Sequence, residues 1–183
     1  DRPIMPALST FALVDEILDL HAQALGPDLP AYRNHVTRVL HFVFAMDPQL
    51  QNTAQPLLIA GAFHDLGIWT AHTFDYLDPS SRLAQDYLKA QGLEPLWPEV
   101  DLIVQQHHKL RRYTGPFEAS VDTFRRADLV DLSLGLIRAG LKPEFIRAVR
   151  VQFPNAHFHK RLATFTGQQF LRTPWNPLPM MRW

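Results

Sequence analysis

The segment 54–64 constrains the fold most, because it is apolar on almost every side. Its apolar residues are Leu57, Leu58, Ile59, Ala60, Ala62 and Phe63. A helix without a polar face for solvent is a buried helix, so other helices must pack around this one. The segment ends in the doublet His64-Asp65, and Gly67 is expected to terminate the helix shortly after it.

Several other segments have apolar residues at spacings of three and four, separated by residues typical of turns. The further helices are expected at residues 11–24, 31–46, 82–91, 99–109, 120–135, 142–151 and 155–171. Residues 1–9 are expected to form an arm, 68–79 an aromatic loop, and 173–183 a tail rich in Pro, Trp and Met.

No segment has the alternation of a β-strand, so the predicted fold is all-α, a compact bundle of about seven to nine helices. The length fits one domain over residues 1–183. Its motif region spans about residues 30–135, and the C-terminal helices and tail occupy 142–183.

Composition excludes several classes of protein. The 18 basic and 18 acidic residues balance, which argues against binding to a nucleic-acid polymer or a membrane surface. The absence of cysteine excludes disulfides, thiolate metal sites and a cysteine nucleophile. No apolar run approaches the roughly 20 residues that span a bilayer, and no secretory signal is recognised, so cytoplasmic localisation is expected.

Two imidazoles and two carboxylates on separate predicted helices form a plausible ligand set for a metal. They are His35, His64, Asp65 and Asp128. Imidazole and carboxylate together suit one divalent ion of Mn, Fe, Co, Ni or Zn, with one ion expected rather than two. Asp131, three residues after Asp128, is a candidate partner for an imidazole N–H. The ion would offset the cost of burying carboxylates and would activate water.

This order of ligands resembles the HD-domain superfamily of metal-dependent phosphohydrolases, named for its His-Asp doublet. The resemblance implies an HD-type helical bundle and an enzyme in which metal-activated water attacks the phosphoester of a small molecule or nucleotide. In the similar mononuclear HD proteins that hydrolyse nucleoside monophosphates, the doublet typically belongs to the motif His-Asp-x-x-Glu. This chain has Ile68 at the position of that glutamate. The chain therefore departs from the nucleotidase pattern.

His107 and His108 form a second histidine feature, in the predicted helix 99–109. Adjacent helical residues point about 100° apart, so only one of the two is expected to face the site. In two-metal HD proteins the doublet aspartate bridges the ions and two more histidines hold the second ion; His72 and one of His107 and His108 are the candidates here. Otherwise His107 or His108 would act as a catalytic acid or bind substrate.

Cationic and aromatic residues near these motifs suggest the substrate. Lys109 follows the histidine pair as a further catalytic candidate, and Arg33 and Arg112 are candidates for binding an anionic small molecule. Trp69 and Tyr76 in the aromatic loop either shape the pocket or pack onto the core.

Three other functions stay open. Some HD proteins with extra histidines resemble this chain and use a mixed-valent di-iron centre to oxygenate a small organic substrate. Others, similar in keeping one metal, hydrate a small unsaturated substrate such as cyanamide. A non-catalytic ligand-binding module is the last alternative. The tail residues Trp175, Met180, Met181 and Trp183 cover either the chain's own core or a partner, and a homodimer is one option.

Overall fold

The computed structural model describes residues 8–73, 75–176 and 178–181, and within them it contains helices and no strand. Eight α-helices have nine or more residues: α1 (Ala12–Leu20), α3 (Leu29–Met46), α4 (Ala54–Phe63), α6 (Leu77–Gln91), α7 (Trp97–Gln106), α8 (Glu118–Leu132), α9 (Pro143–Gln152) and α10 (Phe158–Arg172). Two single-turn helices, α2 (Ala22–Leu25) and α5 (Gly67–Thr70), and three short 3-10 helices lie between them. The prediction of an all-α bundle of this size is confirmed.

Helix α4 is the central element of the bundle, as its apolar sequence predicted. Leu57, Ile59 and Phe63 are all completely buried. The helix contacts α1, α3, α6 and α7, so neighbours surround it on every side that its sequence leaves apolar. Full burial of a large aliphatic or aromatic side chain contributes about 1.5–3 kcal/mol, which makes α4 a main source of stability.

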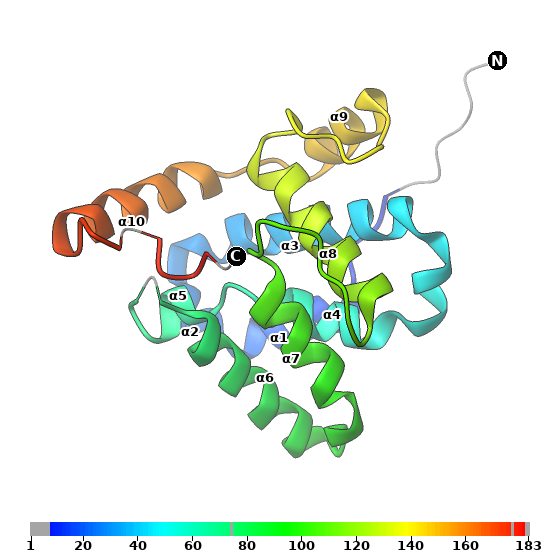
Figure 1. Cartoon of the computed structure of the whole chain (residues 1–183), viewed down its shortest axis with the longest axis horizontal. Coiled ribbons are helices and arrows are strands. Elements are labelled where there is room, and N and C mark those ends of the chain that lie inside the picture. Colours follow the sequence, from blue (N-terminus) through cyan, green and yellow to red (C-terminus); the bar gives the residue numbers. More distant parts are fainter. Residues whose placement is uncertain (1–7, 74, 177, 182–183) are drawn as a thin grey trace.

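Helices α3 and α8 pack against each other across the middle of the molecule (Figure 1). The longest helix, α3, contributes eleven buried residues, and α8 contributes ten. Helix α10 extends to one side of the bundle, and the chain after it returns toward the centre (Figure 1). The polar residues that α3, α4 and α8 carry at their buried faces therefore meet inside the bundle.

Several predicted boundaries differ from the structure. The helix expected at 11–24 breaks at His21, and α6 starts at Leu77 rather than at residue 82. The single turn α5 occupies part of the expected loop 68–79. Helix α7 ends at Gln106, so the histidine pair follows the helix instead of lying inside it. Most of the expected N-terminal arm, and Trp183 of the tail, lie outside the described residues.

Gly67 does not terminate α4, contrary to the expectation from sequence. Helix α4 ends at Phe63, and Gly67 is the first residue of α5. A Cβ atom on Gly67 would lie 2.6 Å from the carbonyl oxygen of Tyr76 and 2.8 Å from Oγ of Ser80. The Gly67 N–H donates to that same Ser80 Oγ at 2.9 Å. Glycine is needed here because two chain segments approach closely.

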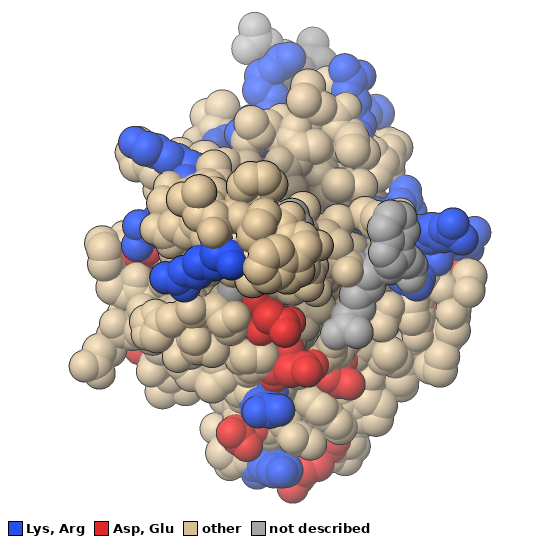
Figure 2. Space-filling view, turned by 60° about the vertical axis from the view of Figure 1, so that its left-hand side comes forward, with Lys and Arg blue, Asp and Glu red and all other residues tan. Residues whose placement is uncertain are grey.

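Charged residues are dispersed on the face in Figure 2, with Lys and Arg mainly in its upper and lateral parts and Asp and Glu gathered below its centre. Among the described helices, none combines the length and the apolar composition that crossing a membrane requires.

The close approach at Gly67 predicts that Gly67→Ala destabilises the protein by about 1–3 kcal/mol, the usual cost of forcing extra atoms into a packed site. Gly167→Ala in α10 is the matched control, because no atom lies within 4 Å of its added Cβ. The control should be neutral or stabilise by up to about 1 kcal/mol, since alanine favours helix. Urea unfolding measures both, and equal effects of the two substitutions would contradict the packing argument.

Candidate metal centre

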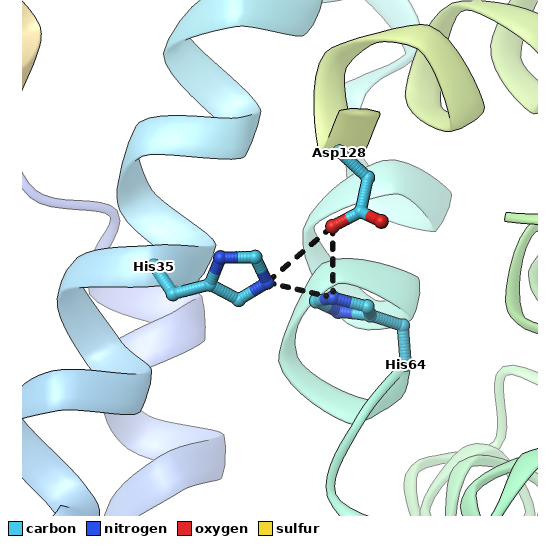
Figure 3. A group of neighbouring side chains, drawn as sticks. All are labelled: His35, His64 and Asp128. Carbon is cyan, nitrogen blue, oxygen red and sulfur yellow. Dashed lines mark hydrogen bonds and ion pairs between the residues drawn. The ribbon is translucent and has the colours of Figure 1, made fainter. Parts of the chain in front are cut away.

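The four predicted ligands meet in the interior of the bundle. Figure 3 shows His35 from α3, His64 at the end of α4 and Asp128 from α8 pointing toward one another. The two Nε2 atoms lie 3.1 Å apart, and Oδ1 of Asp128 lies 3.5 Å from Nε2 of His35. Oδ2 of Asp65 lies 3.3 Å from Nε2 of His64. All four side chains are at most 3% exposed, so solvent does not screen their charges.

The outer nitrogen of each imidazole is already committed to an acceptor. Nδ1 of His35 donates to Oδ2 of Asp131 at 2.7 Å, and Nδ1 of His64 donates to the carbonyl oxygen of Gly61 at 2.7 Å. A carbonyl oxygen can only accept, and an ionised carboxylate likewise. A neutral imidazole has one N–H, so the inward Nε2 atom of each ring carries a lone pair.

When both rings are neutral, two Nε2 atoms and two carboxylates therefore face one another, and only a shared proton or a metal ion between them offsets their negative charge. Oδ1 of Asp128 is buried and has no hydrogen-bond partner within the described part of the chain. Buried carboxylates are normally paired or bound to metal, because an uncompensated buried charge costs several kcal/mol. The unpaired oxygen and the inward Nε2 atoms fit a cation at their common centre.

The described residues contain three overlapping sets of potential metal ligands whose donor atoms lie within 4.8 Å of one another. The sets are His35, His64 and Asp128; His64, Asp65 and His107; and His107, His108 and Asp128. This buried cluster of histidine and aspartate could therefore hold one metal ion or more.

Both His107 and His108 approach the cluster, although only one was expected to. Nε2 of His107 lies 3.2 Å from Oδ1 of Asp65, and its Nδ1 donates to the carbonyl oxygen of Val104 at 2.7 Å. Nδ1 of His108 lies 3.9 Å from Oδ2 of Asp128. The expectation assumed regular helix, but α7 ends at Gln106 and the chain turns at the pair.

Asp131 orients His35, as predicted, and the sequence reasoning missed the residue that orients Asp131. The guanidinium of Arg38 is completely buried and binds both carboxylate oxygens of Asp131, through Nε at 2.7 Å and Nη2 at 2.9 Å. A two-point contact of this kind fixes the carboxylate more firmly than a single bond. The available signal was the position of Arg38, three residues after His35 on a helix that is otherwise mostly apolar.

Tyr32 was also missed. Its hydroxyl donates to the carbonyl oxygen of Ala62 at 2.9 Å and accepts from the backbone N–H of Asp65 at 3.2 Å. The chain is thereby held on both sides of His64, at the point where α4 ends.

The cluster attracts positive charge. Burial lowers the pKa of His64, but the nearby carboxylates of Asp65 and Asp128 outweigh it and raise this pKa to about 10. Burial raises the pKa of Asp65, yet the charge of His64 and bonds with His107 and His35 hold it well below its usual range. A proton on His64 and a metal ion therefore compete for the same electron pairs.

Four of the predicted site residues do not reach the cluster. His72 is an exposed loop residue with φ of +51°, and it lines a separate cavity of about 430 Å³ together with Trp69. Arg33 pairs with Asp15 and Asp19 on α1, at 3.1 and 2.5 Å. Arg112 pairs with Glu118 at 2.8 Å. Sequence proximity to the ligands did not predict these positions, because nearby acidic residues bind the arginines.

A cavity of about 270 Å³ opens beside the cluster. Asp65 and Asp128 line it, together with His107, His108, Lys109 and Tyr76. The Tyr76 hydroxyl lies 2.6 Å from Nε2 of His108. Tyr76 and Lys109 are thus the two further predicted residues that lie next to the ligands.

In comparisons with family models, with curated proteins and with solved structures, the chain matches none of them. The geometry of the buried residues is therefore the support for a metal site in this protein.

The pair of Asp131 with Arg38 and His35 predicts a pH dependence of stability. Burial raises the pKa of Asp131, but hydrogen bonds from His35 and Arg38 hold it well below its usual range. A depressed pKa contributes stability above the unfolded value of about 3.9, and this contribution is lost as the pH falls below that value. Asp131→Asn should cost about 3–5 kcal/mol at pH 7, because it leaves a buried cation unpaired.

Urea unfolding at pH 7 and pH 3 measures this dependence. The difference between wild type and Asp131→Asn should shrink at pH 3, because the carboxylate of the unfolded wild type is then largely protonated, while the folded protein keeps it ionised. Asp86→Asn, at an exposed position of α6, is the control and should change stability by less than about 0.5 kcal/mol at either pH. An equal cost of Asp131→Asn at both pH values would contradict the assignment.

Proposed function

We propose that the protein is a metal-dependent hydrolase of the HD type, which cleaves the phosphoester of a small molecule. His35, His64, Asp65 and Asp128 would hold the ion. The observation that carries the proposal is the convergence of two inward-facing Nε2 atoms and the unpaired Oδ1 of Asp128 beside a cavity. A bound divalent ion lowers the pKa of a coordinated water and polarises the bond under attack.

The chain's own residues supply the orientation that such chemistry needs. Asp131 and the Gly61 carbonyl fix the two imidazoles, and Tyr32 fixes the backbone of Asp65. Ligands held by outer hydrogen bonds keep their donor atoms directed inward without a cost at the moment of binding. This support from buried neighbours is what a preorganised catalytic metal site requires.

The cavity residues suit an anionic substrate with a leaving group. Lys109 and Arg125 line the cavity, and Nε of Arg125 is held by Oδ1 of Asp122 at 2.8 Å. Cationic side chains favour a phosphate group near the ion. His107 and His108 line the same space, where they can bind substrate oxygens or assist proton transfer.

The proposal predicts metal content and phosphatase activity together. Protein purified without chelator should contain about one divalent ion per chain by elemental analysis, and protein reloaded with Mn, Co, Ni or Zn should release phosphate from members of a phosphoester panel. Asp128→Ala should abolish both bound metal and activity, because it removes a carboxylate ligand whose buried Oδ1 has no hydrogen-bond partner among the described residues.

Asp86→Ala, which removes an exposed carboxylate on α6, is the control and should retain both properties. Release of no phosphate from any ester by the reloaded wild type would overturn the proposal. Equal metal content in Asp128→Ala and wild type would overturn the ligand assignment.

A second candidate is a two-ion centre of the kind that the oxygenase hypothesis needs. The two oxygens of Asp65 face different histidines: Oδ2 lies 3.3 Å from Nε2 of His64, and Oδ1 lies 3.2 Å from Nε2 of His107. A carboxylate so placed can bridge two ions. Two irons per chain and a mixed-valent electron paramagnetic resonance signal would favour this candidate, and a single ion other than iron would exclude it.

A further inference from the structure

Beyond its polar end, the cavity beside the ligand cluster is bounded by aliphatic side chains. We call six of them the apolar wall: Leu129 and Leu132 of α8, Leu162 of α10, and Leu178, Met180 and Met181 of the tail. Helix α8 is distant in sequence from the other two segments, and the tail lies beside α10 because the chain turns back after that helix (Figure 1). The non-reacting group of a ligand bound at the cluster would therefore contact the apolar wall.

The wall is only partly covered by the protein itself. Met180 is 7% exposed, whereas Leu129 and Leu178 are each 39% exposed. Apolar atoms that line a cavity and still contact solvent gain free energy when a ligand covers them. This surface adjoins Asp65 and Asp128, so the same ligand can reach both.

The lining does not suit a nucleobase. Proteins bind unpaired bases by stacking them on aromatic or guanidinium planes and by hydrogen bonds to their edges. Among the described lining residues there is no Trp, Phe, Asn or Gln. The planar groups that do line the cavity have partners: Tyr76 lies against His108, His107 lies at Asp65, and Arg125 binds Asp122. Aliphatic walls instead match alkyl groups, which need shape and burial but no polar partner.

We propose, building on the hydrolase function above, that the substrate is a phosphate monoester of a short aliphatic alcohol, with its alkyl group against the apolar wall. The phosphate lies at the ligand cluster and Lys109, and the tail closes the far side of the alkyl site. The Met180 and Met181 side chains therefore limit the length of the group that fits. Leu162, on the neighbouring helix, is a specificity-determining residue.

Methionine methyl resonances test the site without any turnover. The chain has four methionines. Met180 and Met181 line the cavity, while Met46, at the end of α3, does not. In the zinc-loaded protein with ¹³C-labelled methionine methyls, hexylphosphonate should shift the resonances of Met180 and Met181 and leave that of Met46 unchanged. Affinity should rise from ethyl- to butyl- to hexylphosphonate by up to about fourfold per buried methylene.

The Leu162→Gln variant tests the wall at a half-buried position of α10. It should weaken hexylphosphonate about tenfold, since several buried methylenes lose their contact, and leave inorganic phosphate binding unchanged. Leu171→Gln is the matched control on the same helix, at a residue that is 83% exposed and outside the cavity. It should bind both probes like the wild type.

The outcomes separate this inference from the hydrolase proposal. If no ester is hydrolysed but phosphonate affinity grows with chain length, the apolar wall stands and the hydrolase proposal fails. If phosphate is released but the KM does not depend on alkyl length, or adenosine monophosphate binds more tightly than hexylphosphonate, the inference is overturned. If no phosphonate binds, 1-hexanol provides the deciding probe, and its failure to shift Met180 and Met181 overturns the wall as well.

Discussion

The structure of the site depends on three N–H groups that point outward. Nδ1 of His35 is bound to Asp131, Nδ1 of His64 to the Gly61 carbonyl and Nδ1 of His107 to the Val104 carbonyl. Each bond directs the remaining nitrogen of a neutral ring toward the same two buried carboxylates. Acceptors that face acceptors in a dry interior are stable only around positive charge, and this constraint underlies both the electrostatics and the proposed chemistry.

Helix termination and ligand positioning use the same bonds. His64 follows the last residue of α4, and His107 follows the last residue of α7. In both cases the ring binds a carbonyl oxygen three residues earlier, one of the groups that a helix end leaves without an intrahelical donor. The backbone thus gains a hydrogen bond at two buried helix ends, and each ring is locked with Nε2 inward. Replacing either histidine would affect the helix end as well as the site.

The sequence predicted the parts of the structure that follow from local patterns. The apolar composition of α4 required a central position, and the periodicity elsewhere gave the all-α bundle. The approach of His35, His64, Asp65 and Asp128 followed from their order and the resemblance to HD proteins. The early end of α7 escaped prediction, because no Gly or Pro marks it; the ring of His107 binds the Val104 carbonyl there. Gly67 was misinterpreted, because its role is a contact with Tyr76 and Ser80 that no local pattern encodes.

Ion pairs between residues on different segments were the other feature that the sequence did not predict. Arg33 and Arg112 were assigned to the substrate from their position in the sequence, but acidic residues on other segments bind them. Arg38 was overlooked for the same reason, since its importance appears only when Asp131 of α8 lies against α3. The sequence of the tail showed its composition but did not predict which part of the structure the tail contacts. Met180 is buried at the cavity, while Trp175 is 82% exposed and covers no core.

The most direct test of the account is the protonation state of the buried imidazoles when metal is present. Long-range ¹H–¹⁵N correlation spectra of ¹⁵N-histidine-labelled protein, recorded during a zinc titration, distinguish the two ring nitrogens of each residue. The account predicts that His35 and His64 keep the proton on Nδ1 and that zinc shifts their Nε2 resonances. A proton that stays on Nε2 of either ring in the zinc-bound protein would contradict it.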